Sequence, residues 1–111
     1  MKKLFLLLTI ALLPMVAKGY TALVDGIYYD LDNLFGTAQV TYKYISSQNE
    51  EAYKGNVNIP LTVKYGNQTY NVTSISNYAF VYCSNLTSVT IPTSIEFIGS
   101  AAFRYCEKLT V

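Results

Sequence analysis

The chain has 111 residues, two cysteines and no histidine or tryptophan, and its formal net charge is +1. Without histidine, Ser-His-Asp and Cys-His catalytic arrangements are excluded, and so are histidine-ligated metal sites. The nearly balanced charge gives no reason to expect binding to nucleic acid or to an anionic membrane.

The first 19 residues, MKKLFLLLTIALLPMVAKG, have the organisation of a secretory signal peptide. Two lysines precede an apolar run from Leu4 to Val16, and the small residues Ala17 and Gly19 follow, so we expect cleavage after Gly19. The apolar run is shorter than the roughly 18 to 20 residues of a membrane-spanning helix. The sequence predicts an exported protein, secreted or at the cell surface, with no membrane span after cleavage.

Residues 20–71 are predicted to form a small antiparallel β unit. Short runs rich in Val, Ile, Thr and Tyr alternate with Gly, Asn, Asp and Ser, as in DGIYYDLD, GTAQVTYKYI, NVNIPLTVKYG and QTYNVTSI. Gly66 and Asn67 predict a two-residue hairpin turn, whereas the polar segment SSQNEEAYKG is interpreted as a loop. A unit of this kind, distinct in sequence from the residues after it, is suited to cap one end of a repeat array.

Residues 72–111 contain a repeat. ISNYAFVYCSNLTS aligns with IGSAAFRYCEKLTV when Ile75 is placed over Ile98, and seven of the fourteen positions are identical. A fixed period of about 20 to 50 residues is typical of a solenoid, in which each repeat buries its apolar face against the next. YAFVYC and AAFRYC are each expected to form a short helical turn, and Gly99 is expected to lie in a turn.

The recurring apolar residues are predicted to form the interior of the repeat. Phe80 and Phe103 are expected to stack along its axis. Ser88 and Thr90 alternate with apolar residues, so their hydroxyls are expected to point outward and to form the binding face. The predicted interior consists of Phe80, Cys83, Leu86, Val89, Ile91, Ile95, Ile98, Phe103, Cys106 and Leu109.

Cys83 and Cys106 occupy equivalent positions of the repeat, and two interpretations of them remain open. A disulfide would suit an exported protein with an even number of cysteines. The alternative is a pair of small buried thiols that fill a recurrent interior position. We favour the thiols, because side chains stacked on parallel coils rarely present the torsion that a disulfide requires.

The pattern AF-x-x-C-x-x-L-T-x-V-x-IP-x-S-I-x-x-I-G-x-x-AF-x-x-C resembles the BspA-like leucine-rich repeats of secreted and surface proteins of host-associated bacteria. The resemblance covers residues 72–111 as one complete and one truncated repeat, and DGIYYDLDN, VTYK and YKGNVNIP are similar to the N-terminal cap of these proteins. It implies a mainly β fold with short helical turns, in which a right-handed solenoid of parallel strands follows a small antiparallel β cap. It also implies export and, in several members, adhesion.

No pattern of catalytic or metal-ligating residues accompanies the repeat, so we predict no enzymatic activity, no metal and no cofactor. Asp30 and Asp32 resemble the start of a calcium loop, but the required Gly and Glu do not follow at the right spacing. The leading hypothesis is an exported, non-enzymatic protein of the cell surface that binds a host or cell-surface protein or glycan. Nucleic acid is not expected as a partner.

The alternative hypothesis is that the chain is the structural cap and spacer of a longer multidomain surface protein, or a truncated gene product. One complete repeat and part of a second are fewer than the three or so repeats that a stable solenoid normally needs. A last coil with no coil after it would expose an unpaired apolar edge, which predicts self-association.

Overall fold

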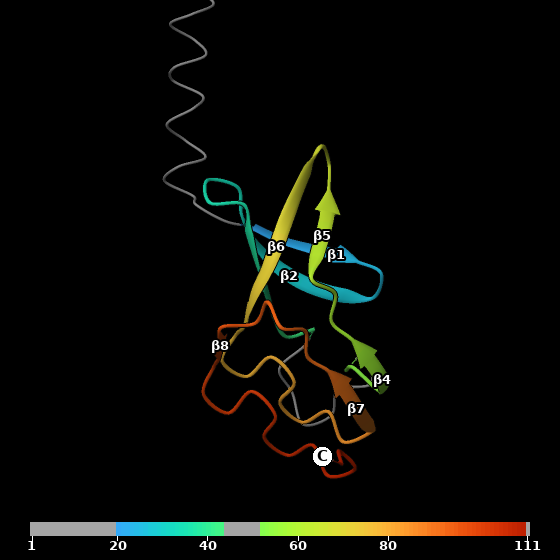
Figure 1. Cartoon of the computed structure of the whole chain (residues 1–111). Helices are drawn as coiled ribbons and strands as arrows, with labels where there is room; N and C mark the ends of the chain where they lie inside the picture. The colour runs from blue at the N-terminus through green and yellow to red at the C-terminus, as the bar shows by residue number, and fades with distance from the viewer. Residues whose placement is uncertain (1–19, 44–51, 111) are drawn as a thin grey trace, which may run out of the picture.

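Eight β-strands make up the regular structure of this computed structural model, which describes residues 20–43 and 52–110 (Figure 1). The predicted signal peptide, residues 1–19, lies outside the described residues. The strands are β1 (Tyr20–Val24), β2 (Ile27–Asp32), β3 (Thr37–Val40), β4 (Gly55–Asn58), β5 (Thr62–Tyr65), β6 (Gln68–Ile75), β7 (Leu86–Thr90) and β8 (Phe97–Ile98).

The larger sheet has the strand order β1-β2-β3-β6-β5, and β8 also pairs with β6. Strands β1, β2 and β3 form an antiparallel meander, and β5 and β6 form the hairpin that Gly66 and Asn67 predict, with Tyr65 opposite Gln68. Only Gly66 of the two turn residues has a positive φ, 63°, as in a turn with glycine in its first central position. The end strands β1 and β5 contact each other, so the sheet is curled.

The sheet is mixed, which corrects the prediction of an antiparallel cap. Strand β3 pairs with β6 in parallel, with Thr37 opposite Asn71 and Val40 opposite Ile75. The chain can place these strands in parallel because β4 and β5 lie between them in sequence and carry it back to the start of β6. Strand β6 therefore belongs to both parts of the molecule: its first half pairs with β5 and its second half with β8.

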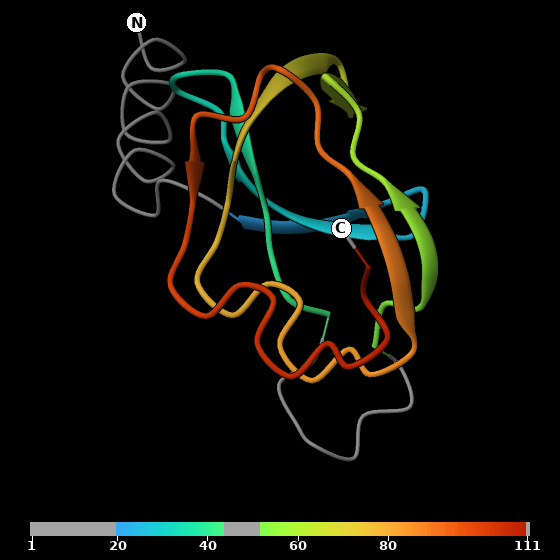
Figure 2. The same cartoon turned by 60° about the horizontal axis from the view of Figure 1, so that its bottom comes forward.

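Two coils follow β6, and they lie side by side in Figure 2, where residues 76–86 and 99–110 trace the same winding path. The backbone N–H groups of Tyr78, Phe80 and Tyr82 donate to the carbonyl oxygens of Ser100, Ala102 and Arg104, at 3.1, 2.7 and 2.9 Å. Ile75 lies opposite Ile98 in the β6–β8 pair, so the predicted alignment of the two repeats is confirmed.

The coils consist of tight turns, and the predicted helical turns are wrong. Tyr78 and Tyr82 have φ of 62° and 61°, and the equivalent Ala101 and Tyr105 have 56° and 63°. A left-handed residue at every fourth position reverses the chain before a helical hydrogen-bond pattern can extend. Local bonds then close single turns, as from Val81 N–H to the Tyr78 carbonyl. No helix occurs in residues 20–43 and 52–110, and so none there could span a membrane.

Equivalent residues become more exposed toward the C-terminal end of the stack of coils. Val40 lies beside Ile75 and Ile75 beside Ile98; the first two are fully buried, whereas Ile98 is 45% exposed. In the same way Ile59 is buried, whereas Ile91, which follows the β7 strand paired with β4, is 42% exposed. The structure thus differs from the predicted interior at Ile91 and Ile98, because no later coil covers them in the described chain.

The other predicted interior residues contact the core. Phe80, Cys83 and Leu86 are fully buried, and the remaining ones pack against the core while partly buried: Val89, Ile95, Phe103, Cys106 and Leu109. The rings of Phe80 and Phe103 are 5.0 Å apart and nearly parallel, as expected for stacking along the axis. Tyr53 extends this column from the other side of Phe80, with ring centroids 4.8 Å apart.

Gly99 has a different role from the turn that the sequence predicts. Its N–H donates to the carbonyl of Ile75 at 2.8 Å, which places it directly against the preceding coil. A Cβ at this position would overlap the backbone nitrogen and the Oδ1 of Asn77 and would lie 2.7 Å from the carbonyl carbon of Ser76. Glycine is therefore required here for the close approach of two backbones.

Candidate binding surface on the parallel strands

Strands β4 and β7 form a two-stranded parallel sheet whose outward side carries only uncharged polar residues. The register places Asn56 opposite Ser88 and Asn58 opposite Thr90. Asn56, Asn58 and Thr90 are exposed and Ser88 is partly buried, whereas the intervening Val57 and Val89 pack against the core. We call Asn56, Asn58, Ser88 and Thr90 the polar row.

Hydrogen bonds hold part of the polar row in a fixed geometry. Ser88 Oγ donates to Asn56 Oδ1 at 2.6 Å, and Thr87 Oγ1 donates to the same oxygen at 3.1 Å. Thr87 can reach Asn56 because the pairing shifts by one residue between Gly55 and Asn56. With Oδ1 accepting both bonds, the amide nitrogen of Asn56 faces outward as a donor.

The structure places the two predicted binding residues on one strand of the polar row, and the sequence reasoning missed the other strand. Asn56 and Asn58 were assigned to the cap, yet GNVNIP repeats the alternation and the V-x-I-P pattern of TSVTIP. That similarity was a usable signal. The offset between GNVNIP and TSVTIP is 32 residues, measured from Asn56 to Ser88. The offset between the two aligned coils is only 23 residues, measured from Ile75 to Ile98.

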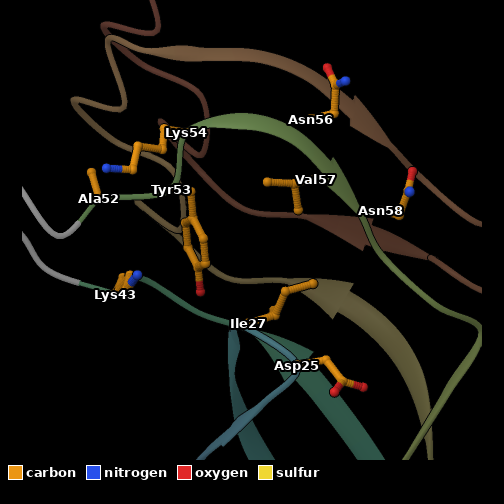
Figure 3. A pocket seen from close by; sticks show the side chains of 10 residues that line it. Asp25, Ile27, Lys43, Ala52, Tyr53, Lys54, Asn56, Val57 and Asn58 are labelled. Atoms are coloured by element: carbon orange, nitrogen blue, oxygen red, sulfur yellow. The ribbon is translucent and has the colours of Figure 1, made fainter.

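An open concavity of about 350 Å³ lies between β4 and the turn that joins β1 to β2. Figure 3 shows Lys43 and Lys54 near Ala52 at one end of it and Asp25 at the other. Asn56, Val57 and Asn58 of β4 also line the concavity. The concavity and the polar row therefore adjoin each other, and Asn56 and Asn58 belong to both.

Tyr53 lines this concavity, but its hydroxyl is committed to the fold. It donates to the carbonyl of Thr41 at 2.8 Å and accepts from the N–H of Tyr28 at 2.9 Å. Burial raises the pKa of Tyr53, so the phenol stays protonated at neutral pH. A protonated phenol held by two backbone groups positions the segment after β3 and does not act as an acid or base.

Cys83 and Cys106 are free thiols in the structure. Cys106 Sγ donates to the carbonyl of Phe80 at 3.0 Å. Burial is the main cause that raises the pKa of Cys83 to about 11, and it raises the pKa of Cys106 as well. Neutral thiols of this kind are poor nucleophiles and poor metal ligands at neutral pH, so they act as interior packing groups.

The described residues contain no cluster of three or more His, Cys, Asp or Glu side chains that could hold a metal ion. Their most regular exposed feature besides the polar row is a pair of tyrosines on the coils. The rings of Tyr82 and Tyr105 stack 4.8 Å apart with 11° between their planes, and Arg104 lies 5.0 Å from the centre of the Tyr105 ring. This pair repeats with the coil, as the interior column does.

Residues 56–111 match the family model described as BspA type leucine rich repeat region (6 copies). The chain belongs to the BspA-type leucine-rich repeat family. The resemblance found in the sequence is thereby confirmed, and the chain is a leucine-rich repeat protein. The match begins before Val72, within the predicted cap, so the boundary between cap and repeats stays a prediction.

Solved structures of leucine-rich repeat proteins are similar to the chain over most of its length. One from Bacteroides ovatus is 33% identical, with a TM-score of 0.68, and the match covers 81% of this chain and 22% of that one. One from Bacteroides capillosus is 32% identical, with a TM-score of 0.64, and the match covers 81% of this chain and 62% of that one. No curated protein matches the chain.

A third similar structure, a leucine rich cell surface protein from Faecalibacterium prausnitzii, is 21% identical with a TM-score of 0.51. The match covers 82% of this chain and 29% of that protein, and at this identity it supports the fold alone. In each of the three comparisons the chain spans less than two thirds of the other protein.

Proposed function

We propose that this BspA-type chain is an exported, non-enzymatic binding module whose polar row contacts a partner protein of the host or of another cell surface. The observation that carries the proposal is the row itself. Four uncharged hydrogen-bonding side chains lie outward on two paired strands, and Ser88 is fixed to Asn56 at 2.6 Å. Groups already held in place lose little conformational entropy when a partner binds them.

The chemistry of the row favours a hydrogen-bonded contact over an electrostatic one. Amides and hydroxyls both donate and accept, so they suit the backbone and polar side chains of a protein surface. None of the four residues is charged, and we therefore expect binding that depends only weakly on ionic strength.

The area of the row indicates that a longer face is used. A stable protein interface buries about 800 Å² on each partner, which two strands of four and five residues cannot supply alone. We propose that parallel strands continue this face in a right-handed solenoid. Thr110 N–H donates to the Thr87 carbonyl at 3.3 Å, so the chain is already returning to the free edge of β7 at that residue.

The second candidate function is that of a cap and spacer for a longer surface protein. Its support is the coverage of the relatives, since the chain matches 22% of the Bacteroides ovatus protein and 62% of the Bacteroides capillosus protein. In that case the described strands position a binding region elsewhere and contact no partner themselves. The DNA that follows the codon for Val111 helps to distinguish the two: a continuing frame that leads into a domain of another kind favours the spacer, whereas further AF-x-x-C units alone are expected under both.

Binding is tested with the exported protein immobilised and exposed to a panel of purified host matrix proteins. We expect at least one to bind at micromolar concentration, and we expect Thr90→Arg to weaken that binding more than about tenfold because it inserts a long charged side chain into the interface core. Thr69→Arg is the matched control, since Thr69 is an exposed strand residue of the cap sheet. Equal losses of affinity in Thr90→Arg and Thr69→Arg, or no binding to any matrix protein, would count against the polar row as the binding face.

Export and self-association are tested on the same material. Mass spectrometry of the exported protein is expected to show an N-terminus at Tyr20 if the signal peptide is cleaved after Gly19.

We also propose that the exposed Ile91, Phe97 and Ile98 mediate weak self-association. Sedimentation at increasing concentration measures it, and a purely monomeric protein at about 100 μM would contradict it.

A further inference from the structure

The curled sheet of the cap has a second recessed surface, at the end where β2, β3, β5 and β6 are joined by turns. A pocket of about 470 Å³ lies there, lined by Asn33, Tyr65, Gly66, Asn67, Gln68 and Tyr70. Pockets of about 300 to 1,000 Å³ are the usual size of small-molecule sites, and the mouths of curled or closed sheets are a common place for them.

The strand register shows that this pocket continues the inner face of the sheet. Val63 lies opposite Tyr70, and both are buried in the core. Tyr65 and Gln68 also lie opposite each other, and each is two residues nearer the hairpin tip than Val63 and Tyr70, respectively. Because side chains two residues apart on a strand face the same side, Tyr65 and Gln68 continue the inner face. Tyr70 lines the pocket at its buried end, being only 1% exposed, whereas Tyr65 lines it while 41% exposed.

The turn that supplies Asn33 is held firmly beside the hairpin. Asp32 Oδ1 accepts hydrogen bonds from the N–H groups of Leu34 and Phe35 at 3.0 and 3.2 Å, so the carboxylate is engaged by its own turn. Gln68 Nε2 donates to the carbonyl of Asn33 at 3.4 Å, and Asn71 N–H donates to the carbonyl of Gly36 at 2.8 Å. These bonds fix the pocket before any ligand arrives.

The lining has a definite chemical character: two tyrosines, three primary amides and no charge. The nearest lysine in sequence, Lys64, lies on the outer face, because it is exposed next to the buried Val63. An aromatic ring offers a flat surface to apolar C–H groups, and an amide both donates to and accepts from a hydroxyl. Together they match a ligand with an apolar face and a rim of hydroxyl groups, without charge.

We propose that this pocket, the cap pocket, binds a neutral sugar residue of an oligosaccharide. The ring of Tyr65 packs against the C–H face of the sugar, and the amides of Asn67 and Asn33 bond its hydroxyls. Gln68 is a positioning residue, since its amide nitrogen holds the Asn33 turn in place. The cap pocket is independent of the polar row, so either site can fail without affecting the other.

The test is a titration of the ¹⁵N-labelled exported protein with maltotriose, cellotriose, mannotriose and N-acetylchitotriose, followed by NMR. We expect at least one sugar to give saturable shifts of the side-chain amide signals of Asn33, Asn67 and Gln68, with a Kd on the order of 1 mM. No saturable shift at about 50 mM of any of the four, or shifts confined to the polar row, would overturn the proposal.

Variants assign the binding to the cap pocket. Tyr65→Ala is expected to weaken the affinity at least about tenfold, whereas Tyr65→Phe keeps the ring and stays within about threefold of the original. If Tyr65→Ala does not fold, Asn67→Ala decides, because Asn67 is an exposed turn residue with no positive φ to preserve. Thr69→Ala is the control on the outer face and is expected to change nothing. Unchanged affinity in both pocket variants contradicts the assignment.

Discussion

Replacing Gly99 by alanine is the most direct test of how the two coils pack. The added Cβ would overlap the backbone nitrogen and Oδ1 of Asn77 and approach the carbonyl carbon of Ser76 to 2.7 Å. Two of these three atoms belong to the backbone, which cannot rotate aside as a flexible side chain does. The coil must therefore shift, and the bond from Gly99 N–H to the Ile75 carbonyl, 2.8 Å long, lengthens or breaks.

The expected loss of stability follows from two opposing effects. Overpacking against an ordered backbone costs about 1 to 3 kcal/mol, and the backbone contacts place Gly99→Ala near the upper end. Alanine also restricts the unfolded chain, which stabilises the fold by about 0.4 to 1 kcal/mol. We expect a net loss of about 2 kcal/mol in the free energy of unfolding. For a domain of this size such a loss lowers Tm by about 8 to 16 °C.

Urea denaturation followed by tyrosine fluorescence measures this loss, because the chain has eleven tyrosines and no tryptophan. Ser100→Ala is the matched control: the backbone N–H of Ser100 bonds Asn77 Oδ1 at 2.7 Å, but its side chain is exposed. In an Asn77→Ala background, Gly99→Ala should still lower the free energy of unfolding by more than about 1 kcal/mol. The reason is that the contacts of the added Cβ with the backbone of residues 76 and 77 remain when the Asn77 side chain is removed. A loss below about 0.5 kcal/mol in the original background would refute the close-approach explanation.

Three further predictions concern the coils and their interior. Phe80→Ala is expected to cost about 3 to 5 kcal/mol and Phe103→Ala clearly less, because Phe80 packs between two rings whereas Phe103 is partly exposed; equal losses in urea denaturation would contradict this. Ala101→Gly is expected to raise stability by about 1 kcal/mol, since Ala101 has a φ of 56°, and a lower Tm would argue against strain there. Burial raises the pKa of Cys83 from 9.0 to about 11. The stability that comes from the neutral thiol is therefore complete below about pH 9 and is lost as the pH rises toward 11. Tm measured as a function of pH should fall between these values, and it should fall less in the Cys83→Ala variant.

Much of the repeat could be predicted from the sequence because the residue types that determine how the coils align recur at a fixed offset. Phe80 and Phe103 recur at one offset, and residues at one offset stack when coils pack on each other, so both the aromatic column and the alignment of Ile75 with Ile98 followed from the pattern. The family was recognised from the same residues. Strand positions in the cap followed from local composition in a similar way.

The rest depends on properties that no local pattern encodes. Tyr78 and Tyr82 adopt left-handed conformations that their residue type disfavours, so the turns were mistaken for helical ones. The parallel pairing of β3 with β6 and of β4 with β7 joins strands far apart in sequence. The exposure of Ile91 and Ile98 depends on how many coils follow them. The pairing of Asn56 with Ser88 has one signal in the sequence, the similarity of GNVNIP to TSVTIP, and its offset of 32 residues differs from the 23 of the clearer repeat.

The graded burial along the stack has a consequence for local unfolding. Within the row Val40, Ile75 and Ile98, neighbours on both sides cover the first two residues, and the third has a neighbour on one side only. Opening the outermost coil therefore breaks one set of contacts, whereas opening the coil beneath it breaks two. In native-state hydrogen exchange, amide protons of equivalent residues should differ in protection by coil, with the lowest free energy of opening at the outermost one. Each coil stacked on the free side would transfer that weakest position outward and leave the coils below it more strongly protected.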